Sequence, residues 1–235
     1  MMNQMKNFLG FLLTFLLLAQ ASHAQVRRNA MEAKQNKQAQ IANQAQLDRD
    51  QSELKAFESK LVQLDMALKK QDGVQSASLK KSLLADMQRE IQQSEKKIAQ
   101  DRREVSQSQS ERASSARETN RSRYDRATPD RDLGDARDVR DDRRDQRGDR
   151  RDVVGDKNDL QRQVARTNRQ KEIYAKLQVF TFSSEPALQE KVRVHKALLQ
   201  EFLSTMENDI VATKAEIQED KREAIEDSRE RREDR

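Results

Sequence analysis

The chain has 235 residues, and its 46 Lys and Arg nearly balance its 41 Asp and Glu. Only 34% of the residues are hydrophobic and 4% are aromatic, with five Gly, two Pro, no Cys and no Trp. This composition supplies too few apolar and β-branched side chains for a sandwich, a barrel or a compact α/β enzyme, and it favours long helices. We therefore expect an all-α protein of elongated antiparallel helical hairpins of the coiled-coil type, joined by a disordered or partly helical linker rich in Arg and Asp.

Residues 1–24 have the features of a signal peptide. Lys6 precedes an apolar run over residues 8–19, and small residues follow it. A span of the bilayer takes about 20 helical residues, so this run is too short for a stable transmembrane helix. The preferred cleavage site follows Ala24, with a cut after Ala21 as the alternative, and an uncleaved membrane anchor is the less favoured interpretation. We expect an exported protein, periplasmic in a bacterium or secreted, with no membrane span after cleavage.

The absence of Cys sets a further limit on the exported product. Without Cys the chain has neither a disulfide nor a lipid-modified N-terminal cysteine. The mature protein is therefore neither a lipoprotein nor a small domain held together by disulfides.

A first helical hairpin is predicted over residues 25–120, with a turn near Gly73. Apolar residues recur every seven positions on both sides of that turn, as in a coiled-coil seam. The first arm carries Leu47, Leu54, Phe57, Leu61, Leu64 and Leu68, and the second carries Leu84, Met87, Ile91, Ile98 and Val105. Gly73 is expected to end the first helix in a left-handed conformation, and Ser76 or Ser78 to cap the next. Folding back at Gly73 places Leu64 opposite Leu83.

The far end of this hairpin lacks apolar residues along its helix–helix contact. Asn43, Asp50, Ser94, Asp101 and Ser108 occupy positions where Leu would stabilise the contact. Two helices that each bury one stripe are marginally stable, so this end predicts fraying or self-association.

Residues 121–157 form the predicted linker. They contain 12 Arg or Lys and 11 Asp, and also Pro129, Gly134, Gly148 and Gly155. Asp is a poor helix former, and Gly and Pro interrupt helices, which indicates a solvated, partly helical segment of low complexity.

A second hairpin with a charged tail is predicted over residues 158–235. Its turn is expected near Phe180 and Phe182, with Val179, Phe180 and Phe182 packing on Leu188 and Val192 at that end. A helix start is predicted after Ser183 or Ser184, because Pro186 suits a first turn. The last apolar stripe includes Leu199, Leu203, Met206 and Ile210.

No pattern in the chain predicts catalysis, a metal site or a cofactor. A nucleophile needs a positioned base, and His195 is the one His outside the signal peptide. Its place on the apolar stripe favours a packed residue over a pH sensor. The acidic residues Asp130, Asp132, Asp135 and Asp138 resemble a calcium loop, but Gly134 stands where a ligand is expected and Asp135 where Gly makes the turn. We therefore expect no enzyme, no cofactor and no metal.

The charge totals also disfavour a nucleic-acid partner. The sequence pI is about 9.4, but the net charge is +2 for residues 25–75, +2 for 76–120, +1 for 121–157 and −1 for 158–235. These totals predict no large basic patch, and export removes the usual nucleic-acid partner. Weak contact with anionic envelope polymers stays open through Arg and phosphate.

The amphipathic stripes are the strongest functional signal, and self-packing is their simplest interpretation. Where the seam is weak, the same residues could contact a protein partner or a second copy. We expect a non-enzymatic cell-envelope scaffold or protein-interaction module that forms homo-oligomers. In architecture alone, the predicted hairpins are similar to periplasmic helical-hairpin holdase chaperones, although those lack an Arg- and Asp-rich segment. The resemblance implies the alternative function, a holdase for unfolded envelope proteins.

Overall fold

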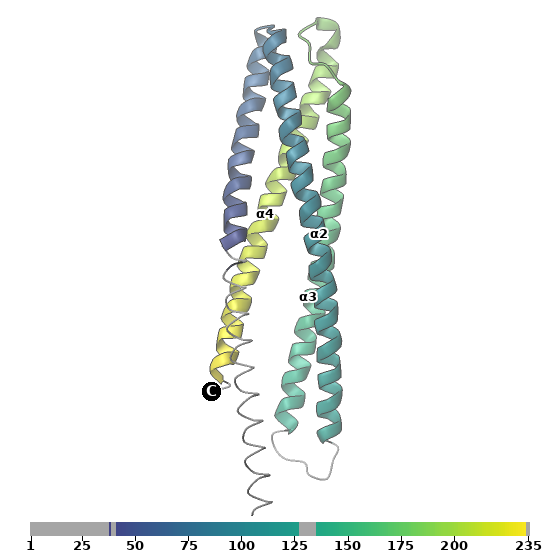
Figure 1. Ribbon diagram of the computed structural model, residues 1–235. Helices are drawn as coiled ribbons and strands as arrows, with labels where there is room; N and C mark the ends of the chain where they lie inside the picture. Colours follow the sequence, from purple (N-terminus) through teal and green to yellow (C-terminus); the bar gives the residue numbers. More distant parts are fainter. Residues whose placement is uncertain (1–37, 39–40, 127–134, 234–235) are drawn as a thin grey trace, which may run out of the picture. The chain divides into compact units, whose positions relative to one another are not determined.

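The computed structural model describes residue 38, residues 41–126 and residues 135–233, and these residues form helices without any strand (Figure 1). An N-terminal helix covers residues 41–69. It is followed by α2 (Gly73–Arg126), α3 (Asp135–Val179), the short 3-10 helix η1 (Pro186–Leu188) and α4 (Gln189–Glu233). The predicted all-α class is confirmed, with four long helices that pack together. The predicted signal peptide lies outside the described residues.

The helices belong to two compact units. The larger unit is Leu54–Glu207. The smaller unit contains, among the described residues, the helical segments 41–53 and 208–233. In the smaller unit Leu47, Ile210 and Ile217 are buried, and Asn43 Nδ2 donates a hydrogen bond to Asp220 Oδ2 at 2.9 Å. This bond links the two segments of the smaller unit.

Four helices of the larger unit surround one core, and ion pairs mark which helices are neighbours. The pairs are Lys60–Asp86 between the N-terminal helix and α2, Glu95–Lys171 between α2 and α3, Arg169–Glu201 between α3 and α4, and Lys196–Asp65 between α4 and the N-terminal helix. Most of these side chains are partly solvated, so such pairs contribute little stability. They do define a closed order of four helices.

The apolar core of the larger unit draws on all four helices and on the loop before η1. Its buried members are Phe57, Leu61, Leu64, Ala67, Leu79, Leu83, Met87, Ile91, Ile173, Leu177, Phe182, Val192, Leu199, Phe202, Leu203 and Met206. Phe57 and Phe202 are fully buried, and their ring centroids are 5.6 Å apart. Burying a large side chain contributes about 1.5–3 kcal/mol. The core therefore supplies the main stabilisation of this unit.

The first turn is tighter than the sequence predicted. Gln71, with φ of 57°, adopts the left-handed conformation, while its amide bonds Leu68 O and the Asp72 amide bonds Ala67 O. These bonds form a Schellman motif. The Asp72 carboxylate then accepts a 2.9 Å bond from the Gln75 amide and caps α2. The predicted left-handed Gly73 and Ser caps are thus wrong, because Asp72 ends one helix and caps the next, which leaves Gly73 as the first residue of α2.

The predicted Arg- and Asp-rich linker is helical wherever the structure describes it. α2 continues to Arg126 and α3 begins at Asp135, so neither 120 nor 158 is a helix end. Gly148 and Gly155 lie inside α3, where nothing approaches within 4 Å of an added Cβ. Their cost to the helix is therefore one of propensity, about 1 kcal/mol each relative to Ala. The predicted division of the chain into modules stays a prediction.

The second turn, between α3 and η1, lies at the same end of the larger unit as the first turn. We call this end of the unit the turn end. Lys80 Nζ on α2 donates to the Gln178 carbonyl at 3.0 Å and satisfies a free C-terminal carbonyl of α3. Pro186 opens η1 as predicted. Val179, however, is 84% exposed and does not join Phe182 in the core. As the last residue of α3, it lies past the buried stripe that ends at Leu177.

Replacing Phe202 tests the core. Phe202→Ala should lower the free energy of unfolding by about 3–5 kcal/mol, because it removes a fully buried ring and its contact with Phe57. Val194→Ala on the same helix, at a half-exposed position, should change it by less than about 0.5 kcal/mol. Urea unfolding followed by far-UV circular dichroism measures both. Equal effects would contradict this core.

Candidate functional site

The residues predicted to form an interaction seam all lie at buried or half-buried positions. Buried are Leu47, Phe57, Leu61, Leu64, Met87, Ile91, Phe182, Leu199, Leu203, Met206 and Ile210. Half-buried are Leu54, Leu68, Leu84, Ile98 and Phe180. The larger unit brings most of them together in its own core. Leu47 and Ile210 lie in the smaller unit.

The seam prediction missed part of the face that α2 presents. Leu79, which the prediction left out, is buried, whereas Leu84 is only half-buried; Leu83, predicted to lie opposite Leu64, is buried. A two-helix seam needs one narrow stripe, but α2 has two neighbours in the bundle and buries a wider face. In the sequence, the recurrence of apolar residues every four positions at Leu79, Leu83 and Met87 is the pattern that could have predicted this wider buried face.

Polar side chains form a hydrogen-bonded layer next to the apolar core. Gln170 of α3 is fully buried. Its Oε1 accepts a bond from Ser94 Oγ of α2 at 3.2 Å, and its Nε2 donates to Thr205 Oγ1 of α4 at 3.1 Å. Thr205 Oγ1 in turn donates to the Phe202 carbonyl at 2.6 Å. The layer therefore links three helices and fixes their mutual register, because a satisfied polar network permits one alignment.

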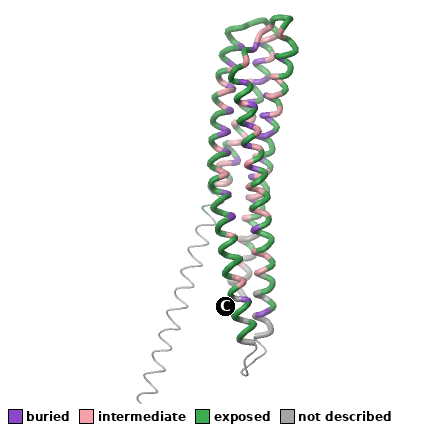
Figure 2. The backbone as a smooth tube through the Cα atoms, turned by 90° about the vertical axis from the view of Figure 1, so that its right-hand side faces the viewer, coloured by how far each residue is buried: buried purple, intermediate pink, exposed green. Residues whose placement is uncertain are grey.

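The polar contact continues along α2 and α3 away from the turn end. Stepping seven residues forward on α2 and seven back on α3 leads from Ser94 and Gln170 to Asp101 and Gln163, which are both buried. The next step reaches Ser108 and Asp156, and Ser108 Oγ donates to Asp156 Oδ2. We call this series the polar seam. Figure 2 shows that buried positions are dense near the turn end and sparser along the rest of these helices.

Asp101 is the acidic member of the polar seam. Burial raises the pKa of its carboxyl group, and Glu104 and Asp159 add to the shift. Lys97 Nζ, 3.3 Å from Asp101 Oδ1, acts in the opposite direction. The net rise means that the ionised carboxylate is less stable in the folded protein than in water.

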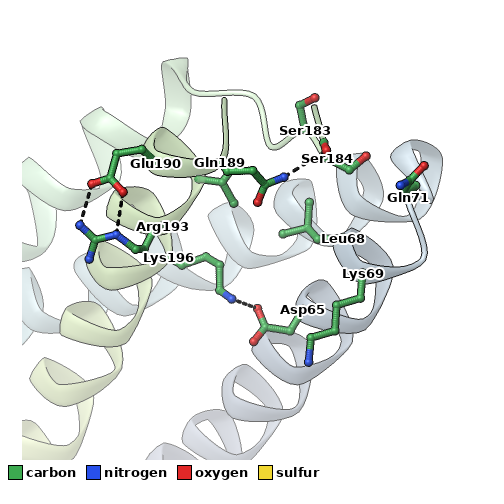
Figure 3. Close-up of a pocket in the computed structure, with 11 residues that line it drawn as sticks. Asp65, Leu68, Lys69, Gln71, Ser183, Ser184, Gln189, Glu190, Arg193 and Lys196 are labelled. Atoms are coloured by element: carbon green, nitrogen blue, oxygen red, sulfur yellow. Dashed lines mark hydrogen bonds and ion pairs between the residues drawn. The ribbon is translucent and has the colours of Figure 1, made fainter. Parts of the chain in front are cut away.

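A cleft of about 620 Å³ lies at the turn end, between the end of the N-terminal helix and the beginning of α4 (Figure 3). Lys196 Nζ pairs with Asp65 Oδ1 at 2.6 Å, and Arg193 forms a two-pronged pair with Glu190 at 2.6 and 2.8 Å. The Arg193 guanidinium holds the pKa of Glu190 below its ordinary value. Four of the lining charges therefore neutralise each other.

His195 is packed against the turn-end loop. Its ring stacks on Phe180 with centroids 3.6 Å apart, and its Nδ1 lies 2.7 Å from the Lys191 carbonyl. An Nδ1–H tautomer would donate to that carbonyl. The half-buried position agrees with the packed residue that its sequence position predicted.

The described residues offer neither a metal cluster nor a membrane-spanning helix. No group of three or more His, Cys, Asp or Glu there is placed to hold a metal ion. None of the helices in the described range is long and apolar enough to cross a bilayer. No family model, curated protein or solved structure matches the chain.

Removing the central amide of the polar layer should destabilise the bundle. Gln170→Ala leaves a cavity and removes the amide that bonds the Ser94 and Thr205 hydroxyl groups, so we expect a loss of about 1–3 kcal/mol. Gln161→Ala, at an exposed position of the same helix, is the matched control and should have little effect. Urea unfolding compares the two, and similar losses would show that the layer contributes no stability.

Neutralising Asp101 should stabilise the protein at neutral pH. Because its pKa is raised on folding, the folded state binds more protons than the unfolded state just above the ordinary pKa, and stability falls as the pH rises through that range. Asp101→Asn should thus raise the free energy of unfolding at pH 7, and the gain should vanish below about pH 4. Asp48→Asn, at an exposed site, controls for charge. A gain that persists at pH 3, or a loss at pH 7, would contradict the assignment.

Proposed function

We propose that the protein is an exported, non-enzymatic scaffold or protein-interaction module of the cell envelope, built from antiparallel coiled-coil hairpins. The observation that carries this proposal is that the larger unit packs its apolar seam residues against one another. The larger unit encloses its largest apolar side chains, such as Phe57, Met87 and Phe202, in its own four-helix core. A self-packed core on long helices suits a protein that holds other groups at a distance.

The non-enzymatic part of the proposal rests on how the titratable groups are used. In the turn-end cleft, Arg193 and Lys196 are each bound to a carboxylate. His195 is stacked on Phe180, and its Nδ1 is close to a backbone carbonyl. General acid–base catalysis needs a group whose proton is available to a substrate. These groups are instead engaged in contacts within the fold.

A protein partner or a second copy is the proposed binding partner. The stretch of α2 and α3 beyond the polar layer buries few apolar side chains, among them Val105, Val139 and Val153. Exposed apolar residues such as Val62 and Met66 lie one turn apart on the N-terminal helix. Helices with so little buried apolar area gain stability from association.

The holdase alternative has less support. A holdase needs apolar surface that faces an unfolded client, and the seam residues are buried or half-buried. The exposed large apolar residues include Val74, Val179 and Val211, which lie on different helices or far apart in sequence. Singly exposed apolar residues are normal on protein surfaces, and the pair Val62 and Met66 is too small a patch to enclose an unfolded client.

The proposal is tested on the chain that begins at Gln25. We expect predominantly helical far-UV circular dichroism and a sedimentation coefficient that rises with concentration. Low helicity, or a monomer at every concentration, would contradict the proposed self-associating scaffold.

A chaperone assay separates the two candidate functions. Substoichiometric amounts of the same chain should leave the aggregation of a denatured outer-membrane β-barrel protein unchanged. Suppression of that aggregation would replace the scaffold by the holdase.

A further inference from the structure

Acidic and basic side chains occupy opposite faces of the N-terminal half of α3. Asp149, Asp152, Asp156 and Asp159 follow one another at spacings of three and four residues, which places them on one face of the helix. That face is turned toward α2, because Asp156 accepts the hydrogen bond from Ser108. Asp149, Asp156 and Asp159 are half-buried accordingly, whereas Asp152 is exposed.

The arginines lie on the face turned away from α2. We call Arg143, Arg144, Arg147, Arg150 and Arg151 the outer Arg row, and all five are exposed. Within the described part of the chain none of the five forms an ion pair. Among contacts to described residues, the row's side-chain hydrogen bond goes from Arg147 Nε to the Arg143 carbonyl at 3.0 Å. Their guanidinium groups are therefore available to a ligand.

This arrangement is unfavourable for an isolated helix. Neighbours on a helix surface are three and four residues apart, and for the charged residues of 147–152 and for Asp156 those neighbours are Arg beside Arg and Asp beside Asp, as for Arg147 beside Arg143 and Arg151. Like charges at this spacing destabilise a helix, whereas alternating them would have formed ion pairs. The sequence thus gives up local stability for a basic outer face, which indicates that the outer face has a partner of opposite charge.

The aspartates do not neutralise the outer Arg row. They lie across the helix, about 10 Å away, a distance at which salt largely screens exposed charges. Their environment is itself acidic: Asp149, Asp156 and Glu111 of α2 all raise the pKa of Asp152, after the larger effect of burial, and Arg151 opposes them. An approaching anion meets the Arg row first.

We propose that the outer Arg row of α3 binds a linear, phosphate-bearing polyanion. This goes beyond the scaffold function, which does not require it. Arg143, Arg147 and Arg150 follow one another at spacings of four and three residues, so the helix rise of 1.5 Å gives roughly one guanidinium every 5 Å along a line on this face. Guanidinium forks bind phosphate through two parallel hydrogen bonds. A row of such forks matches repeated phosphates along a polymer, whereas a compact ligand would contact one or two of them.

The binding experiment uses the chain from Gln25 and fluorescently labelled linear inorganic polyphosphate, with anisotropy measured at several salt concentrations. The variant is R147Q/R150Q/R151Q. At about a fivefold effect per Arg, its affinity should fall on the order of 100-fold. The slope of log affinity against log salt should decrease by about 2, because three fewer phosphates are neutralised.

The matched control removes the same charge from arginines that already have acidic partners. R89Q/R162Q/R193Q changes residues paired with Asp86, Asp159 and Glu190, and it should retain affinity within about fivefold of the unaltered chain. Circular dichroism of both variants establishes that each is folded. R147K/R150K/R151K keeps the charge without the forks, so it should bind more weakly than the unaltered chain and more tightly than R147Q/R150Q/R151Q.

Three results would overturn the proposal. The first is that the unaltered chain does not bind polyphosphate, and the second is that the two Gln variants lose affinity equally. The third is that the chain binds vesicles with anionic lipid but does not bind polyphosphate. The last result would assign the row to a membrane surface. None of these results affects the helicity or self-association that tests the scaffold.

Discussion

Packing around Phe57 and Phe202 is the interaction on which the larger unit depends. The chain has few apolar side chains, and this unit places its largest ones where four helices meet. The ring pair joins the first and last of those helices. Because these helices are far apart in sequence, their contact closes the bundle and positions α2 and α3 between them. The cleft, the polar layer and the outer Arg row all lie on helices that this core holds in place.

Alignment beyond the core depends on polar contacts. Apolar packing alone tolerates sliding of one helix past another, whereas a buried amide that bonds Ser94 and Thr205 is satisfied in one register only. The polar seam carries that register along α2 and α3 as far as Ser108 and Asp156. The acidic side of α3 is thereby turned to α2, which leaves the arginines on the outside. The apolar core thus holds the helices together, the polar contacts set the register of α2 against α3, and that register places the arginines of α3 on the outside.

Composition predicted the fold class, and local signals predicted the heptad residues of the N-terminal helix, the break near Gly73 and the start at Pro186. Each of these local signals depends on a few neighbouring residues. The buried face of α3 was harder to predict because Gln163, Thr167 and Gln170 are polar and leave no hydrophobic period. The net charges of whole segments likewise did not reveal the outer Arg row, because such a sum does not distinguish the faces of a helix. Gly73 is the expected left-handed residue because Gly usually takes that conformation, yet Gln71 does so here.

Disulfide cross-linking measures the central claim, the register of α2 against α3, most directly. The chain has no Cys, so the double variant Ser108→Cys with Asp156→Cys introduces the only possible pair. Mild oxidation should give an intramolecular disulfide, detected by mass spectrometry and by faster migration in a non-reducing gel. The variant Ser108→Cys with Gln163→Cys places the two cysteines two helical turns out of register. It should form no intramolecular disulfide. A cross-link in the second variant but not the first, or cross-links only between chains, would contradict the account.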